Sequence, residues 1–338
     1  MRKPVVSAVF AACVAVFAAS QSLAQDIQER TIRWGHLNNT DHPVSLAAQR
    51  FAAIVLEKSG GKMKIKEYPA STLGNELQQQ SALRGGTQEI LSTSTASLTG
   101  IVKEFGLLDF PFNVQTPQQS DALVDGPFGT ALLNKLLEKD LVGLVYWDLG
   151  FRQVTNSKRP ITKLEDLNGL KLRVIPNPVF VETFKALGAN PVPMAFAEVY
   201  GALESHAIDG QENPISVVTS AKLYEVQKYI SATNHAYTTP IVLVSKKFWD
   251  KLSPAEQKIM RDAAIESRAY NRKINREQNE QGVAELKAKG MQQNALPAAE
   301  LARMRDATKA VTDKFAAEYD QETVKLFRSE LERVRGIK

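Results

Sequence analysis

The sequence contains almost no cysteine. Among its 338 residues only Cys13 is a cysteine, and it lies close to the N-terminus. A chain that has lost this segment has no thiol for a disulfide, a metal–thiolate site or nucleophilic catalysis. We therefore expect the fold to be stabilised by a hydrophobic core, which a chain of this length with 43% hydrophobic residues can supply.

Long hydrophobic runs are also missing, apart from one near the N-terminus. Arg2 and Lys3 precede an apolar run over residues 5–19, and Ser22-Leu23-Ala24 places small residues at a typical cleavage point. The run is shorter than the roughly 20 apolar residues that span a bilayer. The pattern predicts that residues 1–24 are a secretory signal peptide, not a membrane anchor, and that the mature protein is periplasmic.

The sequence has no strongly basic block. Its formal net charge is +5, and two of the positive charges, Arg2 and Lys3, fall within the predicted signal peptide. The remaining excess is spread along the chain. This distribution gives no support for a nucleic-acid partner and fits a mild attraction for small anions.

Motifs of the common enzyme classes are absent. The sequence contains no G-x-S-x-G, H-E-x-x-H, G-x-x-x-x-G-K or G-x-G-x-x-G pattern. The four histidines, His36, His42, His206 and His235, lack the spacing of metal ligands. We therefore expect no catalysis, no cofactor and no metal site. An exported enzyme of carboxylate metabolism stays open as the alternative functional class.

Segments typical of strands and helices alternate along most of the chain, which favours an α/β fold. A helix after Pro43 places Ala48, Phe51 and Val55 on one face and ends near Gly60. The expected strands cover residues 32–36, 62–68, 89–93, 141–147, 170–175 and 241–245. The apolar character of residues 141–147 and 241–244 predicts central strands that are covered on both faces.

The C-terminal third is charged and helical. Ser253-Pro254-Ala255-Glu256 forms a capping box that predicts a helix running toward Lys287. Pro297 opens a second helix, whose apolar positions do not keep a heptad spacing. We therefore expect packed amphipathic helices of a globular protein, not a coiled coil.

Several motifs resemble those of one known family, the substrate-binding subunits of tripartite ATP-independent periplasmic (TRAP) transporters of the DctP type. They are GFRQVTN at 150–156, NGLKLRV at 168–174, PMAFAEVY at 193–200 and DGQENP at 209–214. LGNE at 73–76 and DFPF at 109–112 also match, and the similarity extends across nearly the whole mature chain.

The resemblance implies a two-lobed periplasmic-binding-protein-like fold with discontinuous domains and long C-terminal helices. We expect residues 25–149 plus about 238–278 in lobe I, and residues 150–237 plus about 279–338 in lobe II. Crossing strands near Gly150 and Tyr237 would join the lobes. The implied partners are a small organic acid and the integral-membrane permease subunits of the transporter, and we expect a monomer.

Arg173 is the strongest candidate for a ligand-binding residue. Leu170, Leu172 and Val174 alternate with it, so its side chain points to the other face, near the carboxyl end where open sheets bind ligands. A guanidinium grips a carboxylate through two parallel hydrogen bonds, although a surface arginine would show the same pattern. The resemblance implies that Arg173, Arg152 and Asn213 hold the ligand carboxylate.

The first half of the chain is expected to contact the rest of the ligand. The resemblance places Glu76 at a polar ligand contact, and other positions near strand ends can open onto a cleft. Phe196 and Trp147 can cover apolar faces of a ligand, but core packing would use the same residues. The further candidates, each of which also fits ordinary loop or core chemistry, are His36, Asn38, Asn39, Ser94, Trp147 and Phe196.

One clamp for a carboxylate together with neutral polar groups favours a small hydroxylated acid, such as an aldonate or a uronate. Members of the family that bind sialic acid carry a carboxylate at the position of Ser94, so this chain departs from that pattern. A C4-dicarboxylate would need a second cationic cluster, which the sequence does not show. An aromatic or keto acid stays open as a ligand.

Overall fold

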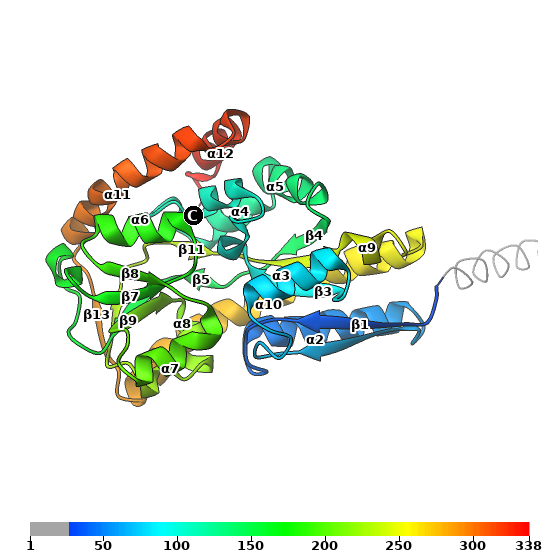
Figure 1. Cartoon of the computed structure of the whole chain (residues 1–338), viewed down its shortest axis with the longest axis horizontal. Helices are drawn as coiled ribbons and strands as arrows, with labels where there is room; N and C mark the ends of the chain where they lie inside the picture. The colour runs from blue at the N-terminus through cyan, green and yellow to red at the C-terminus, as the bar shows by residue number, and fades with distance from the viewer. Residues whose placement is uncertain (1–26, 338) are drawn as a thin grey trace, which may run out of the picture.

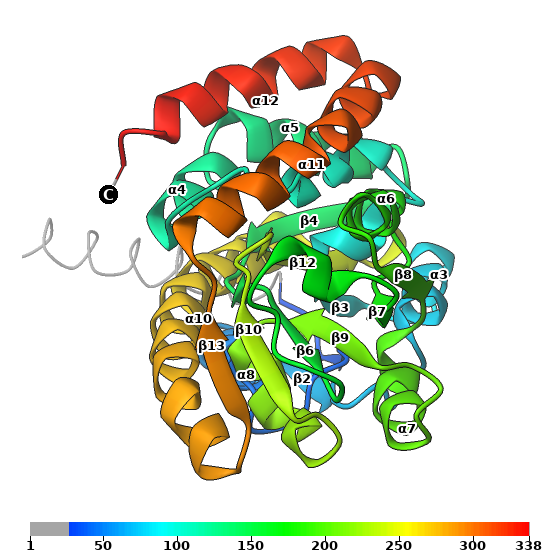
Figure 2. The same ribbon diagram turned by 90° about the vertical axis from the view of Figure 1, so that its left-hand side faces the viewer.

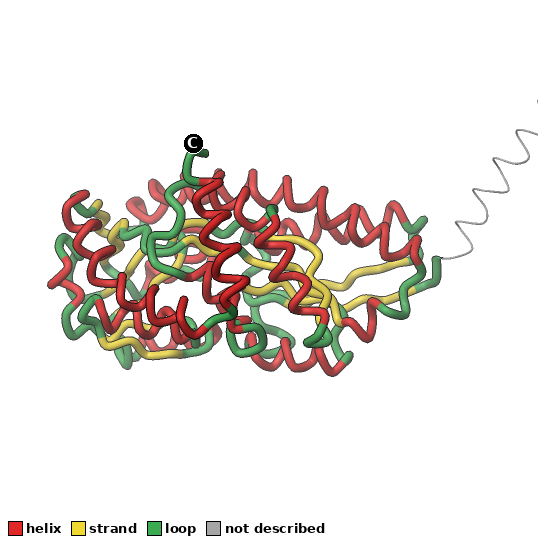
Figure 3. Tube along the Cα trace, turned by 90° about the horizontal axis from the view of Figure 1, so that it is seen from above, coloured by secondary structure: helices red, strands yellow, loops and turns green. Residues whose placement is uncertain are grey.

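The computed structural model describes residues 27–337, so the predicted signal peptide lies outside the described residues. Two sheets lie side by side with helices around them, and one long helix passes along both (Figure 1). Seen from above, the molecule is elongated along the line that joins the two sheets (Figure 3). This arrangement confirms the predicted α/β class.

The first sheet has the strand order β2-β1-β3-β12-β4. Strand β1 runs parallel to β2 and β3, and β12 runs antiparallel to β3 and β4. Every residue of β12 is buried, as expected for a central apolar strand. The strands are β1 (Arg30–Gly35), β2 (Met63–Tyr68), β3 (Ile90–Ser94), β4 (Leu141–Tyr146) and β12 (Pro240–Ser245).

The second sheet has the order β13-β10-β6-β9-β7-β8. Strand β7 runs parallel to β8 and β9, which places the carboxyl ends of β7 and β9 together. Each sheet takes strands from separate parts of the chain, so both are discontinuous, as predicted. The strands are β6 (Gln153–Asn156), β7 (Lys171–Val174), β8 (Asn190–Pro193), β9 (Gly210–Asn213), β10 (Tyr229–Ala232) and β13 (Gln292–Ala295).

Two short antiparallel strands, β5 (Gly150–Phe151) and β11 (Tyr237–Thr238), carry the chain between the sheets. Gly150 has a φ of +109°, a conformation that side chains rarely adopt. Asp148 fixes the start of this connection because its carboxylate accepts hydrogen bonds from Tyr237 Oη at 2.6 Å and Arg276 Nε at 2.7 Å. Both crossing strands are thereby tied to the helix that carries Arg276.

Helices cover the sheets on their outer faces (Figures 1 and 2). The α-helices are α2 (Pro43–Lys58), α3 (Glu76–Gly85), α4 (Pro117–Val124), α5 (Pro127–Leu137), α6 (Pro178–Ala186), α7 (Val199–Glu204), α8 (Ile215–Ser220), α9 (Lys246–Trp249), α10 (Pro254–Ala288), α11 (Ala298–Glu318) and α12 (Gln321–Val334). Short 3₁₀ helices are η1 (Thr95–Leu98), η2 (Lys103–Asp109), η3 (Leu164–Leu167), η4 (Phe196–Glu198) and η5 (Leu223–Glu225). Within residues 27–337 no helix combines the length and apolarity that a bilayer crossing requires.

Helix α10 is the long helix that passes along both sheets. It begins with the predicted capping box, in which Ser253 and Glu256 satisfy each other's backbone N–H groups. It packs against α2 beside the first sheet and against α8 beside the second. Glu256 also holds Arg30 of β1 in a bidentate ion pair, at 2.8 and 2.9 Å. A single rigid element therefore braces both halves of the molecule.

The position of helix α12 differs from the prediction, which placed residues of about 279–338 in the second lobe. Helix α11 does pack against α6 beside the second sheet, but α12 packs against α4 and α5 beside the first (Figure 2). The reason is the apolar face of α12, which packs into the core of the first half. There the ring centroids of Phe327 and Phe128 are 5.0 Å apart. The other predicted boundaries stay predictions.

Truncation of Phe327 tests the packing of α12. Phe327 is 2% exposed, so we expect Phe327→Ala to lower the free energy of unfolding by about 3–5 kcal/mol, the usual cost of an aromatic-sized cavity. Leu137→Ala on α5, at a side chain 45% exposed, is the matched control and should change it by less than about 0.5 kcal/mol. Equal effects of the two substitutions in urea denaturation would show that α12 is not part of this core.

Candidate functional site

A cavity lies between the two sheets, at the carboxyl ends of strands from both. Open α/β sheets bind ligands at this edge. Strand β3 and the loop after β1 line it from the first half, and β7 and β9 from the second. The lining residues are Leu37, Asn38, Val44, Glu76, Ser92, Thr93, Ser94, Ser97, Leu149, Arg152, Arg173, Ile175, Phe196, Asn213, Val217 and Pro240.

Arg173 of β7 is a buried cation in this cavity. It is 1% exposed, and its Nε and Nη2 donate to the carbonyl oxygen of Met194 at 2.9 and 2.6 Å. Among the described residues no carboxylate oxygen lies within ion-pair distance of its guanidinium. Burial lowers its pKa to about 10, so it remains charged at neutral pH. The site therefore holds a positive charge that a bound anion can neutralise.

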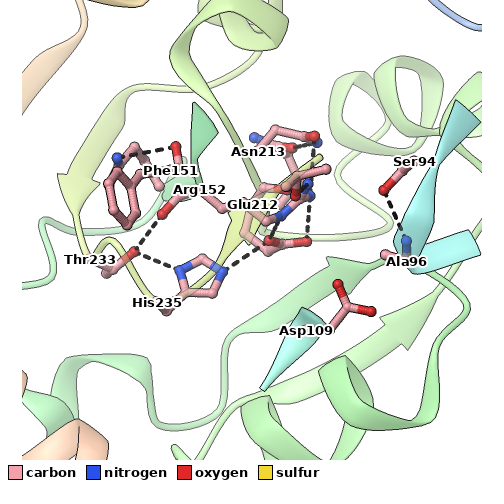
Figure 4. A network of polar contacts seen from close by, with 12 residues as sticks. Ser94, Ala96, Asp109, Phe151, Arg152, Glu212, Asn213, Thr233 and His235 are labelled. Atoms are coloured by element: carbon pink, nitrogen blue, oxygen red, sulfur yellow. Dashed lines mark hydrogen bonds and ion pairs between the residues drawn. The ribbon is translucent and has the colours of Figure 1, made fainter. Parts of the chain in front are cut away.

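Arg152 lies in the same cavity, but its charge is already neutralised. Glu212 grips its guanidinium with both carboxylate oxygens, Nη2–Oε1 being 2.9 Å, and Thr238 Oγ1 accepts from Nη1 at 3.0 Å (Figure 4). Glu212 in turn contacts His235 Nε2 at 3.0 Å. Burial opposes ionisation of Glu212, but Arg152 and His235 hold its pKa below its ordinary value. Arg152 therefore differs electrostatically from Arg173, although the sequence predicted the same role for both.

Asn213 ends β9 with its amide fixed at both groups. Its Oδ1 accepts from Arg152 Nη2 at 3.1 Å, and its Nδ2 donates to Gln211 Oε1 at 2.5 Å. One amide hydrogen has no partner among these bonds, so it can donate to a ligand oxygen. Asn213 thus faces the cavity as an oriented neutral donor.

The first half of the molecule contributes neutral and acidic groups. Glu76 opens α3, where Asn75 forms the capping box, and its Oε1 accepts from the Phe196 backbone N at 3.2 Å. Ser94 Oγ accepts from Ala96 N at 3.2 Å, which leaves its hydroxyl hydrogen free to donate. Asn38 also lines the cavity, as does the Phe196 ring, whose centroid lies 5.9 Å from Arg173 Cζ.

Three of the sequence-predicted candidates do not line the cavity. His36 is fully buried and turns its Nε2 to Glu67 Oε1 at 2.8 Å. The Asn39 amide donates to the Ser220 carbonyl at 2.8 Å. Trp147 stacks on Trp34 in the core, with ring centroids 5.8 Å apart. Each of these side chains contacts a residue that is distant in the sequence, so the contact could not be predicted from the adjacent residues.

Sequence reasoning also missed lining residues on β3 and just beyond it, namely Ser92, Thr93 and Ser97. The run Ser92-Thr93-Ser94-Thr95 could have drawn attention, because small hydroxyl side chains in a buried strand need hydrogen-bond partners. The ion-pair partner of Arg152, Glu212, carried no such signal. It lies 60 residues away in the sequence, and its burial depends on the fold.

Polar contacts also join the two halves on either side of the cavity. Ser220 Oγ donates to Asp41 Oδ1 at 2.7 Å, beside the Asn39 contact. Asn177, at the start of α6, donates to the Ala96 carbonyl at 2.9 Å and to Asp109 Oδ2 at 2.8 Å. These hydrogen bonds link the two halves of the molecule directly. Within residues 27–337 no cluster of three His, Cys, Asp or Glu side chains could hold a metal ion.

The chain belongs to the DctP family. The family profile described as bacterial extracellular solute-binding protein, family 7, matches residues 34–319. The chain is 38% identical over 290 residues to the 2,3-diketo-L-gulonate-binding periplasmic protein YiaO of Escherichia coli (strain K12), covering 86% of this chain and 87% of that protein.

Two solved structures show the same fold. The sugar acid binding protein DctPAm from Advenella mimigardefordensis strain DPN7T, in complex with galactonate, is 39% identical with a TM-score of 0.90, covering 91% of this chain and 100% of that one. A TRAP periplasmic solute-binding protein from Polaromonas sp. JS666 bound to D-erythronate is 34% identical with a TM-score of 0.85, covering 88% of this chain and 98% of that one.

The protein is therefore a TRAP solute-binding protein of the DctP type, as the sequence motifs indicated. Members of this family are periplasmic transport proteins that bind small organic acids and work with membrane permease subunits. The expectation of a binding protein, not an enzyme, is confirmed by this membership.

A buried carboxyl group beside the site makes stability depend on pH. Burial raises the pKa of Asp109 to about 8, so the folded protein keeps its proton while the unfolded chain loses it above about pH 4. This contribution to stability is complete at low pH and disappears as the pH rises toward 8. We expect the melting temperature of the wild type to fall relative to that of Asp109→Asn over this range. If the difference in melting temperature between the two proteins stayed constant over this pH range, the raised pKa of Asp109 would be contradicted.

Proposed function

We propose that the protein captures a small hydroxylated monocarboxylate, such as an aldonate, a uronate or a related sugar acid, for delivery to TRAP permease subunits. The observation that carries the proposal is Arg173, a buried guanidinium that has no carboxylate within ion-pair distance among the described residues. The relatives named above support it, because galactonate, D-erythronate and 2,3-diketo-L-gulonate are all sugar acids.

The ligand carboxylate meets Arg173 and the free amide hydrogen of Asn213. A carboxylate in this place restores charge balance through charge-assisted hydrogen bonds. Arg152 lines the same cavity with its charge held by Glu212, so it contributes by orienting Asn213. Of the three residues predicted from the sequence, Arg173 and Asn213 thus bind the carboxylate directly, while Arg152 acts mainly by orienting Asn213.

The hydroxyl groups of the ligand meet the first half of the molecule. Glu76 accepts hydrogen bonds, Ser94 can donate its hydroxyl hydrogen, and Asn38 can do both. Such groups recognise hydroxyls and do not attract a second carboxylate. Besides Arg152 and Arg173, none of the described cavity-lining residues is a lysine, arginine or histidine. A dicarboxylate would therefore leave one charge without a cationic partner.

Binding is coupled to closure of two lobes about β5 and β11, because the carboxylate and the hydroxyls are bound from opposite sides. Residues 25–149 plus about 238–278 form lobe I, and residues 150–237 plus about 279–320 form lobe II. We place α12 on lobe I in view of its packing. The mature protein acts as a monomer after removal of residues 1–24.

Substitution of Arg173 by lysine tests the carboxylate clamp. An ammonium keeps the charge but cannot form two parallel bonds, so Arg173→Lys should weaken binding by about 2–5 kcal/mol in calorimetry. Arg303→Lys, at an exposed ion pair with Glu165 and Glu300, should bind as the wild type does. Wild-type affinity in folded Arg173→Lys would remove this residue from the site.

The class of ligand is tested by a thermal-shift screen of the mature protein. Aldonates and uronates should raise its melting temperature, because a ligand that binds only the native state stabilises that state. The corresponding amides and methyl esters should not, since they lose the charge-assisted bonds. If succinate or malate stabilised the protein while aldonates and uronates did not, the proposed ligand class would be wrong and the transport role would remain.

A further inference from the structure

A second hollow lies beside the ligand cavity, and two residues line both spaces. It is lined by Asn39 and Ser71 from loops of the first half and by Tyr200 and Leu223 from the second. Leu37 and Phe196 line both this hollow and the ligand cavity. Because each faces both spaces, these two side chains form the partition between them.

Phe196 is held in place from two directions. Its backbone N–H donates to Glu76 Oε1 at 3.2 Å, a contact that crosses from the second half to the first. Its ring lies toward the Arg173 guanidinium, 5.9 Å from the centroid to Cζ, and packs against the cores of both halves. If the ring turned away from the partition, it would lose its contacts with Arg173 and with the two cores. It therefore stands as a fixed wall next to the cation that binds the carboxylate.

The wall on the far side of the hollow is also fixed. Ala70 and Ser71 adopt φ values of +51° and +60°, and their N–H groups donate to the carbonyls of Asn38 at 2.8 Å and His36 at 3.0 Å. Ser71 and Tyr200 line the hollow together with the apolar Leu223, and the Tyr200 hydroxyl donates to Glu225 Oε2 at 2.7 Å. A mixture of polar and apolar residues suits a sugar unit.

We infer that Phe196 is a specificity-determining residue that limits the length of the ligand by closing the cavity against this hollow. The inference rests on the proposed function. A monosaccharide acid fits on the Arg173 side of the ring. A disaccharide acid bound by the same carboxylate meets the ring with its second sugar unit, and removal of the ring gives that unit access to the hollow.

The test compares galactonate with lactobionate, a disaccharide acid, on three full mature proteins. In calorimetry the wild type should bind galactonate and not lactobionate. Phe196→Ala should bind lactobionate at least about tenfold more tightly than the wild type does. Tyr200→Ala is the matched control, because it enlarges the hollow and leaves the partition intact. It should gain no affinity for lactobionate.

Two results would overturn the inference: tight binding of lactobionate by the wild type, or binding of galactonate but not lactobionate by Phe196→Ala. Leu37→Ala opens the same partition from the other half and gives the same test if Phe196→Ala does not fold. A wild type that binds neither galactonate nor any other sugar acid would instead refute the proposed function, and the inference with it.

Discussion

Burying a guanidinium costs free energy unless anionic or carbonyl oxygens replace the water that it loses. At Arg173 the protein supplies one carbonyl oxygen, that of Met194, and no carboxylate within ion-pair distance among the described residues. The rest of the site follows from this incomplete compensation. An anion that enters the cavity repays part of the cost of burial, so the folded protein is prepared for a carboxylate before any ligand arrives.

Arg152 shows how the same problem is solved without a ligand. Its guanidinium meets both oxygens of Glu212, which His235 contacts in turn, so the pair is neutral and well bonded. Two arginines of one cavity thus have different electrostatic states. The excess charge is concentrated at Arg173, while the first half of the molecule presents Glu76, Asn38 and Ser94. In the proposed function this asymmetry directs the carboxylate of a hydroxylated acid to Arg173 and its hydroxyl groups to the first half.

Much of the fold could be predicted from the sequence, because its signals are local. The capping box at Ser253 and the apolar run of β12 depend on neighbouring residues alone, and both appear as expected. Arg173 was predicted as a ligand-binding residue because strand alternation and the family motifs agreed, and it lines the cavity in the structure. The packing of α12 against α5 could not be predicted, since an amphipathic helix shows that it has a buried face and not what covers it.

The individual contacts of the site were harder to predict for a similar reason. A polar residue after a strand can face the cavity or bond within the protein, and His36 and Asn39 do the latter through partners distant in sequence. Trp147 likewise packs on Trp34. Glu212 was not predicted as a site residue, because its role is to pair with Arg152 and only the folded sheet brings the two side chains together.

The account is tested most directly by a crystal structure of the mature protein with a bound sugar acid, such as galactonate. We predict that both carboxylate oxygens lie within about 3 Å of the Arg173 guanidinium and that the hydroxyls are directed toward Glu76 and Ser94. A ligand bound in the opposite orientation, with its carboxylate remote from Arg173, would contradict the account.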